Sequence, residues 1–234
     1  MHSFTKTAHK KPRIAIIVPK YNLVGGGERF AFEVTERMAR EGQYEFHVFA
    51  NRWKAAEGSP VIFHKVPTTS FPRFLRAFIF PWFARHMTNH GNFNVIHSHE
   101  KVFNADIISL HGFPHTEWIR DVRQKEPSFF DRGVALVERW MIESSKARYF
   151  LPVSSIAMEA YRRTYSALSG KWQVMHPGVD VARFSTPDRD TCRAIIRERY
   201  GIGASDVLIL FVGMNFEVKG LDTLIAAVAQ ARAT

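Results

Sequence analysis

RIAIIVPKYNLVGGGERFAFEV, residues 13–34, joins a continuous apolar run, a glycine-rich loop and an amphipathic pattern. An uninterrupted run such as Ile14–Val18 is typical of a β-strand that is buried on both faces. Apolar residues then recur at helical spacing from Phe30 to Met38, and Gly42 is placed to end that helix. The stretch therefore predicts a strand, a loop and a helix, the repeating unit of a parallel α/β sheet.

The rest of the chain continues this alternation. Strands are predicted at residues 46–49, 61–63, 94–97, 106–110, 149–151 and 172–175. Helices are predicted at about residues 71–90, with a break at Pro81, and at 134–146 and 155–168. Since strands that alternate with helices pair in parallel, the sequence predicts an α/β fold with a Rossmann-like, doubly wound sheet.

A second apolar run, Val207–Val212, predicts the first strand of another Rossmann-like domain. The helix that follows from about Gly220 carries an apolar stripe, which must pack on neighbouring strands. We therefore expect a flexible basic tail, an N-terminal domain, a linker that carries a helix, and the start of a C-terminal domain, at residues 1–12, 13–180, 181–205 and 206–234. A complete second domain needs roughly 100 further residues, so we expect the chain to be a fragment that stops inside it.

Composition and charge narrow the class of protein. The 234 residues are 46% apolar and 23% charged, which is typical of globular proteins and excludes disordered and collagen-like chains. The formal net charge of +10 predicts an anionic partner: nucleic acid, an acidic membrane surface or a phosphorylated small molecule. The single cysteine, Cys192, excludes an internal disulfide bond and fits a reducing compartment.

The sequence shows no targeting or membrane-spanning signal. Residues 1–12 lack the apolar core of a signal peptide. The most apolar stretch, residues 77–84, is far too short to cross a bilayer. We therefore expect a cytoplasmic protein, peripheral to a membrane at most.

Three glycines, Gly25, Gly26 and Gly27, lie between the first strand and the first helix. Glycines at such a position let the backbone approach a ligand closely, and the start of the helix offers N–H groups to an anion. The alternative is a tight strand-to-helix turn without a ligand. The pattern lacks the third glycine of the G-x-G-x-x-G motif, which argues against a nicotinamide cofactor. Because open α/β sheets bind ligands at the carboxyl ends of their strands, we favour ligand contact.

Histidines cluster after two of the predicted strands. His97, His99 and Glu100 end one strand, and His111 begins the segment after the next. Histidine and glutamate are metal ligands, so a metal site is one interpretation. The others are histidines satisfied within a cleft, or a histidine whose neutral imidazole contacts a sugar or phosphate. No further strand end rich in carboxylates follows, which disfavours the metal site.

Asp188 and Asp190 form a D-x-D pattern, which binds a divalent cation in some enzymes. The pattern immediately precedes a predicted helix. An N-terminal cap of that helix is therefore the favoured interpretation.

Residues 71–90 interleave basic and aromatic side chains, among them Arg76, Trp82 and Arg85. This mixture suits a helix on an anionic lipid surface, and also a nucleic-acid surface on which aromatic rings stack. The third interpretation is a helix packed on its own domain, with arginine stems covering apolar surface. Between the two external partners, we favour the membrane.

Lys219 and Gly220 lie at the start of a helix that follows the second apolar run. A lysine at that position can join the helix dipole in binding a diphosphate. The alternative is a solvated lysine in a turn. We favour phosphate contact.

Short motifs occur in a fixed order along the chain. They are GGGER (25–29), VIHSH (95–99), LHG (110–112), VSS (153–155), HPGVD (176–180), and FVG (211–213) followed by KGLDTL (219–224). In this order they resemble the retaining glycosyltransferases of family four. That group has the two-domain GT-B fold and includes glycogen synthase-like and lipopolysaccharide-core transferases. The resemblance covers nearly all of residues 13–234.

The resemblance implies an enzyme that transfers a sugar from a nucleotide-diphosphate sugar to a saccharide or lipid-linked acceptor, with retention at the anomeric carbon. It implies no bound metal, no cofactor and no nucleic-acid partner. The N-terminal domain would receive the acceptor and the C-terminal domain the donor. The expected process is biosynthesis of a cell-envelope glycan or lipopolysaccharide at the inner face of the cytoplasmic membrane, with residues 71–90 toward anionic lipid.

The resemblance also assigns roles to individual residues. His111 would lie near the reacting sugar as the catalytic residue. Lys219 would neutralise the charge that grows on the leaving diphosphate, a form of transition-state stabilisation. The other positions carried over are Gly25, Gly26, Gly27 and Gly220 for the donor phosphate, and His99 and Glu100 for the acceptor cleft.

Two features depart from the family. Met214 and Asn215 stand where the family often has an arginine that shares the phosphate with the lysine. The paired glutamates of the family fall later than Thr234, so we expect residues 1–234 alone to be inactive. The alternatives are a non-catalytic Rossmann-like module that binds an anionic membrane or nucleic acid, and a histidine-rich metal hydrolase.

Overall fold

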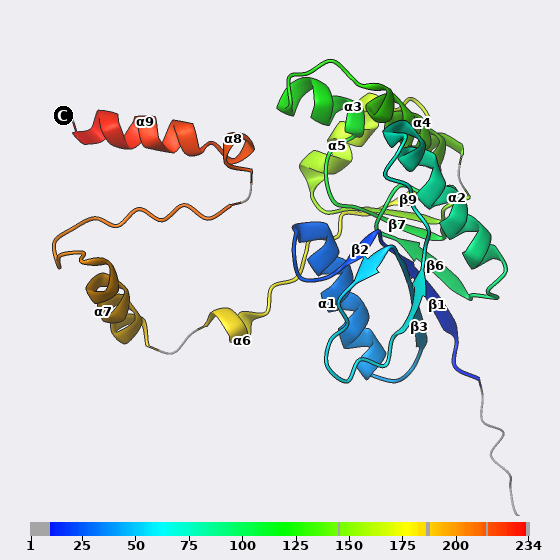
Figure 1. Cartoon of the computed structure of the whole chain (residues 1–234), viewed down its shortest axis with the longest axis horizontal. Helices are drawn as coiled ribbons and strands as arrows, with labels where there is room; N and C mark the ends of the chain where they lie inside the picture. Colours follow the sequence, from blue (N-terminus) through cyan, green and yellow to red (C-terminus); the bar gives the residue numbers. More distant parts are fainter. Residues whose placement is uncertain (1–9, 145, 186–187, 214, 233–234) are drawn as a thin grey trace, which may run out of the picture. The chain divides into compact units, whose positions relative to one another are not determined.

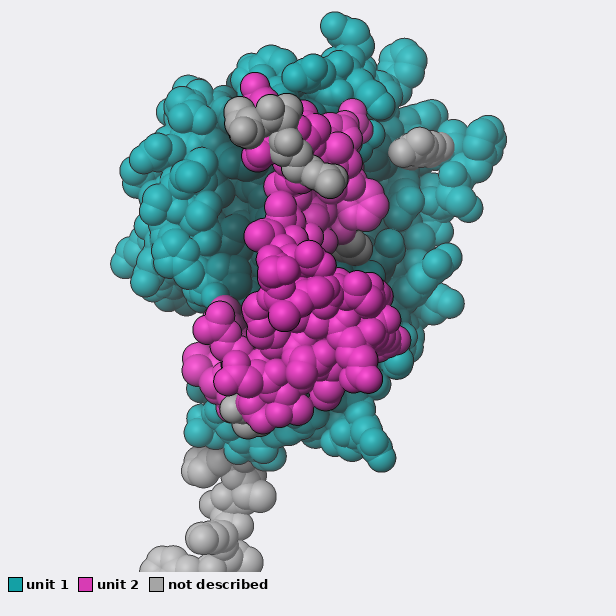
Figure 2. All heavy atoms as spheres, turned by 90° about the vertical axis from the view of Figure 1, so that its left-hand side faces the viewer, with its two compact units in different colours: residues 1–177 teal, residues 178–234 magenta. Residues whose placement is uncertain are grey.

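The structure is a computed structural model that describes residues 10–144, 146–185, 188–213 and 215–232 (Figure 1). The predicted basic tail falls mainly on residues 1–9, which lie outside the described residues. The chain divides into two compact units, residues 1–177 and 178–234, which Figure 2 shows in teal and magenta. None of the helices in the described ranges combines the length and apolar character of a membrane span.

Strands and helices alternate along the first unit as predicted. The strands are β1 (Arg13–Ile17), β2 (Lys20–Tyr21), β3 (Glu45–Ala50), β4 (Arg52–Trp53), β5 (Ile62–Lys65), β6 (Val95–Ser98), β7 (Ile107–Leu110), β8 (Tyr149–Pro152) and β9 (Lys171–Trp172). The helices are α1 (Gly26–Arg40), η1 (Arg73–Leu75), α2 (Arg76–Asn89), α3 (His115–Glu117), η2 (Trp118–Val122), α4 (Phe129–Ser144) and α5 (Ser155–Thr164).

The main sheet has seven parallel strands in the order β5-β3-β1-β6-β7-β8-β9, which confirms the predicted α/β fold. The chain leaves β1 toward β3 and β5, then returns to the other side of β1 and adds β6 to β9. The order of strands therefore reverses between β1 and β6. In open α/β sheets, ligands bind at the carboxyl ends of the strands beside such a reversal.

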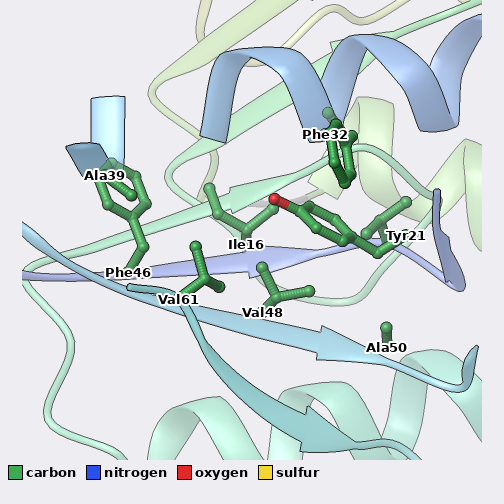
Figure 3. Packing of buried hydrophobic residues seen from close by; sticks show 10 residues of the cluster. Ile16, Tyr21, Phe32, Ala39, Phe46, Val48, Ala50 and Val61 are labelled. Carbon is green, nitrogen blue, oxygen red and sulfur yellow. The ribbon is translucent and has the colours of Figure 1, made fainter. Parts of the chain in front are cut away.

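The apolar run at β1 is buried on both faces, as predicted. Ile16 packs on α1 through Phe32 and Ala39, with Tyr21 and Val48 in the same cluster (Figure 3). The alternate residues Ala15 and Ile17 face the opposite side, where Phe80 and Ala84 of α2 cover the sheet. A third cluster joins β7 and β8 to α4 and α5, with Ile108, Phe150, Met141 and Tyr161 at its centre. Helices thus cover both faces of the sheet, which explains why its central strands read as continuous apolar runs.

The predicted helix break at Pro81 is wrong, because α2 continues through this residue. A proline inside a helix removes one backbone hydrogen bond and costs about 3 kcal/mol. Here Ala77, Phe80, Pro81 and Ala84 are all buried. Their packing against the domain offsets the local cost and keeps the helix intact.

The second unit contains α6 (Val181–Phe184), α7 (Arg189–Tyr200), α8 (Phe216–Lys219) and α9 (Leu221–Arg232). The Asp188 side chain accepts hydrogen bonds from the backbone N–H groups of Asp190 and Thr191 at the start of α7. This geometry confirms the helix cap predicted for the D-x-D pattern.

The strand predicted at Val207–Val212 is not formed, which corrects that prediction. The described part of this unit holds helices and no strand that could pair with the segment, whose Val207 is 87% exposed. A strand requires a hydrogen-bonded neighbour. For the same reason the apolar stripe of α9 finds no sheet among the described residues, and its Ile225 is exposed.

Candidate functional site

A cavity of about 870 Å³ lies in the first unit, where β1, β6 and β7 end. Val18 and Pro19 follow β1, and residues 99–101 and 111–113 follow β6 and β7; all of them line the cavity. Gly27 and Glu28 of α1 complete this edge. The cavity therefore occupies the position beside the strand reversal at which this class of sheet binds ligands.

Each of the three glycines has a different role in the structure. Gly25 has a φ of +91°, a conformation that glycine adopts without strain, and a Cβ atom there would collide with the Glu28 carboxylate. Gly26 begins α1 and faces open space. At Gly27, a Cβ atom would lie 3.1 Å from Cγ of His111. Gly27 thus lets the start of α1 contact the imidazole directly.

The histidines make two separate hydrogen bonds at this edge of the sheet. His97 Nε2 lies 2.9 Å from Ser109 Oγ, and His99 Nδ1 lies 3.0 Å from His111 Nε2. The His99 and His111 rings stack with their centroids 5.3 Å apart, and Phe30 contacts both rings. Pairing of β6 with β7 brings these residues together, because the two strands end at the same edge of the sheet.

All three imidazoles are held in the neutral form. Burial lowers the pKa of His97 to about 4, and burial also lowers the pKa of His99 well below its ordinary value. The pKa of His111 is lowered by burial as well, although Glu100 opposes the shift. At neutral pH, one ring of the His99–His111 pair donates the hydrogen bond and the other accepts it. The cluster therefore offers hydrogen bonds to hydroxyl groups and carries no charge of its own.

The low pKa of His97 predicts a pH dependence of stability. The unfolded chain takes up a proton on this histidine near pH 6.5, whereas the folded chain takes it up only near pH 4. Between these values the unfolded state binds more protons, so the free energy of unfolding must fall as the pH is lowered from 6.5 to 4. Urea unfolding of the wild type and of His97→Gln across this range checks the expectation. The variant should lose less stability on acidification; an equal loss in both proteins would contradict it.

An ion pair that sequence reasoning missed closes one side of the cavity. Lys101 follows β6 and lines the cavity, and its Nζ lies 3.3 Å from Oε2 of Glu138 on α4. Glu138 is fully buried, and its Oε1 accepts hydrogen bonds from the Tyr165 hydroxyl at 2.6 Å and the His115 backbone N–H at 2.8 Å. The signal in the sequence was a carboxylate in the apolar stripe of a predicted helix.

The structure groups only some of the predicted site residues. Gly27, His99, Glu100 and His111 line one cavity of the first unit. Lys219 belongs to the second unit, where it is exposed as the last residue of α8.

The remaining predictions near Lys219 concern its flanking residues. Gly220 ends α8 with a φ of +76°, and a Cβ on Gly213 would lie 3.3 Å from Cγ of Lys219. Of the two positions that depart from the family pattern, Asn215 caps the start of α8 and Met214 lies outside the described residues. Whether these residues bind phosphate stays a prediction.

A metal centre was one interpretation of the histidines. Within the ranges that the structure covers, no group of three or more His, Cys, Asp or Glu side chains is arranged to hold a metal ion. The histidines contact one another, Ser109 and Phe30 instead.

A doubly wound parallel sheet with a cavity at its strand reversal defines a Rossmann-like domain. Residues 24–183 match the model of Glycosyltransferase Family 4, and the chain belongs to this family. The match includes the glycine loop, both histidine segments and Glu138. The resemblance inferred from the ordered motifs is thereby confirmed.

Individual relatives agree with this assignment. The chain is 23% identical over 227 residues to the lipopolysaccharide glucosyltransferase WaaG of Escherichia coli (strain K12), covering 92% of this chain and 58% of WaaG. It is 29% identical over 166 residues to a probable transglycosylase of Burkholderia thailandensis, covering 70% of this chain and 44% of the relative.

Solved structures share the fold. A crystal structure of WaaG superimposes with a TM-score of 0.76 at 20% identity, covering 92% of this chain and 59% of that one. Sucrose-phosphate synthase from Thermosynechococcus elongatus gives a TM-score of 0.67 at 17% identity, covering 94% and 60%. The chain therefore spans less than two thirds of the length of these relatives.

Proposed function

We propose that this chain forms the acceptor-side domain, and part of the donor side, of an enzyme that transfers a sugar from a nucleotide-diphosphate sugar with retention. The observation that carries the proposal is the neutral histidine pair, packed on Gly27 in the cavity at the strand reversal of a family 4 domain. Uncharged imidazoles suit a ligand rich in hydroxyl groups. Transfer at this site would leave the acceptor glycosylated and release a nucleoside diphosphate.

We assign to Lys219 the stabilisation of the charge that develops on the leaving diphosphate. A leaving diphosphate gains negative charge as the glycosidic bond breaks, and a cation placed to meet that charge stabilises the transition state. Lys219 is an exposed lysine at the end of a short helix, preceded by the apolar segment 207–212 and Gly213. We propose that it binds the diphosphate together with the backbone at Gly220.

We propose that the acceptor is a saccharide or lipid-linked saccharide of the cell envelope. The similarity to a protein named as a lipopolysaccharide glucosyltransferase supports this class of acceptor. Lipid-linked acceptors are made at membranes. A membrane contact through residues 71–90 would bring the enzyme to such an acceptor.

Residues 71–90 supply a surface suited to anionic lipid at the cytoplasmic face. Phe71 is 85% exposed and Trp82 is 55% exposed, and Arg76 and Arg85 of the same segment are exposed as well. The other side of α2 is buried in the domain, so this segment serves both as core and as surface. Aromatic rings and arginines together favour the interface of an anionic bilayer.

Vesicle co-sedimentation checks the lipid contact. We expect more protein to bind phosphatidylglycerol vesicles than phosphatidylcholine vesicles, and Trp82→Ser to reduce the bound fraction. Equal binding to both lipids would contradict the contact.

The function is tested on the protein expressed from its full reading frame. Purified protein is incubated with a panel of UDP-, GDP-, ADP- and dTDP-hexoses, and release of nucleoside diphosphate is measured with and without saccharide acceptors. The anomeric proton of the product, followed by NMR, reports whether configuration is retained. Binding of no nucleotide sugar, with neither hydrolysis nor transfer, would overturn the proposal.

A further inference from the structure

The Lys101–Glu138 pair holds its lysine in a defined orientation. Tyr165 on α5, the His115 backbone and Lys101 all contact the Glu138 carboxylate. These three contacts come from separate segments of the domain. The carboxylate therefore has little freedom, and the ammonium group that faces it is fixed in turn.

A contribution to stability does not by itself explain why an ion pair is buried at this position. Burying an ion pair costs desolvation free energy, and apolar replacements of similar volume are often equally stable. The neighbours of Glu138 on the cavity side of α4, Val137 and Met141, are apolar, and an apolar residue at position 138 would match them. What an apolar residue could not do is orient Lys101 in the cavity wall.

Lys101 keeps donors for a ligand. An ammonium group has three N–H bonds, and the ion pair with Glu138 at 3.3 Å occupies at most one of them. The side chain is 26% exposed and lines the cavity. Burial lowers the pKa of Lys101, but Glu100 and Glu138 outweigh burial and raise it above its ordinary value, so the group stays protonated.

Glu100 stands beside this lysine as an acceptor. Its Oε1 accepts the backbone N–H of Lys101 at 2.8 Å, which holds the carboxylate at the same wall of the cavity. The carboxylates of Glu100 and Glu138 both act electrostatically on this ammonium group. With a carboxylate and an ammonium group at the same wall of the cavity, neutral hydroxyl groups can donate to Glu100 and accept from Lys101.

We propose that Glu100 and Lys101 bind two neighbouring hydroxyl groups of the acceptor saccharide, and that Glu138 is the positioning residue that orients Lys101. The inference rests on the proposed function and specifies its acceptor: the part of the saccharide at this subsite is an uncharged vicinal diol. Lys101 donates to one hydroxyl oxygen, and the adjacent hydroxyl donates to Glu100.

The test measures saccharide binding in the absence of donor. Methyl α-D-glucopyranoside, methyl α-D-mannopyranoside and their monodeoxy analogues are titrated against the chain by saturation-transfer difference NMR. Loss of a hydrogen bond to a charged group weakens binding by about tenfold or more, and we expect this increase in Kd for Lys101→Met. Lys171→Met, which removes an exposed lysine of β9 outside the cavity lining, is the matched control and should leave Kd unchanged.

The deoxy probes separate positioning from folding. For the analogue that lacks the contacted hydroxyl, Lys101→Met should change Kd by less than about twofold, because the interaction is already absent. Glu138→Gln keeps the shape of the side chain and should follow the same probe selectivity, with an increase of about three- to tenfold for the parent glycoside. A merely structural Glu138 would weaken binding of both probes equally.

Three outcomes of the variant titrations would overturn the inference. They are an unchanged Kd in both variants, an equal change for parent and deoxy probes, and tighter binding of glucose 6-phosphate than of the methyl glucoside with that preference lost in Lys101→Met. Failure of any glycoside to bind the wild type would also overturn it. Failure of the proposed function shows itself differently, as absent nucleotide-sugar binding by the protein from the full reading frame.

Discussion

Replacing Lys219 by Ala is expected to lower kcat/KM for sugar transfer by about 10² to 10³, the range measured when one stabilising donor is removed from a transition state. The lysine is exposed at the end of α8, so its loss should leave the fold intact. Because the diphosphate gains charge as the bond breaks, the effect should fall on kcat more than on donor affinity. Steady-state kinetics of the protein from the full reading frame measure both parameters.

The matched control for Lys219 is Arg199→Ala. Arg199 lies on α7 of the same unit and is exposed, with its guanidinium carbon 5.7 Å from the centroid of the Tyr200 ring. Its removal deletes one positive charge, as the Lys219 variant does, and should leave kcat/KM unchanged. Equal activity of Lys219→Ala and wild type would contradict the proposal that Lys219 stabilises the leaving diphosphate. If nucleotide-sugar binding were also absent from the wild type, the non-catalytic module would become the better account.

Replacing His111 by Ala is expected to lower kcat/KM by about 10², the cost of losing one hydrogen bond made to the reacting sugar. His111 lines the cavity, contacts Gly27 and pairs with His99. Its low pKa keeps the imidazole neutral, so the wild-type rate should not rise or fall with titration of this group between pH 7 and 8.

The control for His111 is Gln173→Ala, an exposed position after β9 in the same unit. It should retain wild-type kinetics. The urea midpoint of each variant shows whether the fold survives, since His111 is also packed on Phe30. A folded His111→Ala protein with wild-type kcat/KM would remove this residue from the catalytic machinery.

The first unit of the fold was readable from local patterns. The apolar run at 14–18 becomes β1, the spacing of Phe30 and Met38 becomes α1, and Gly42 follows its end with a positive φ. Each of these signals lies within a few residues of its consequence. Parallel pairing followed from the alternation of strands and helices, which is why the α/β fold was predicted correctly.

The failures share a physical cause, which is dependence on partners distant in sequence. Val207–Val212 has the composition of a strand, but strand formation needs a neighbour that the described residues do not supply. Pro81 breaks isolated helices, yet burial of α2 overrides it.

Dependence on partners distant in sequence also limited what could be predicted of the candidate site. His99, Glu100 and His111 were singled out because they follow strands, and the structure brings them to one cavity. Nothing near Lys101 in the sequence marks it as a site residue. Its partner Glu138 arrives from a helix 37 positions later, by way of tertiary packing.

The hydrogen bond between His99 and His111 couples the tautomeric states of the two rings. When His99 Nδ1 carries the hydrogen, His111 must carry its own on Nδ1, and when His111 carries it on Nε2, the hydrogen of His99 moves to Nε2. Switching between these tautomers transfers a proton from one end of the pair to the other without creating charge. Both tautomers of the pair are electrically neutral, and the nitrogen that carries the hydrogen on one ring is fixed by the choice made on the other.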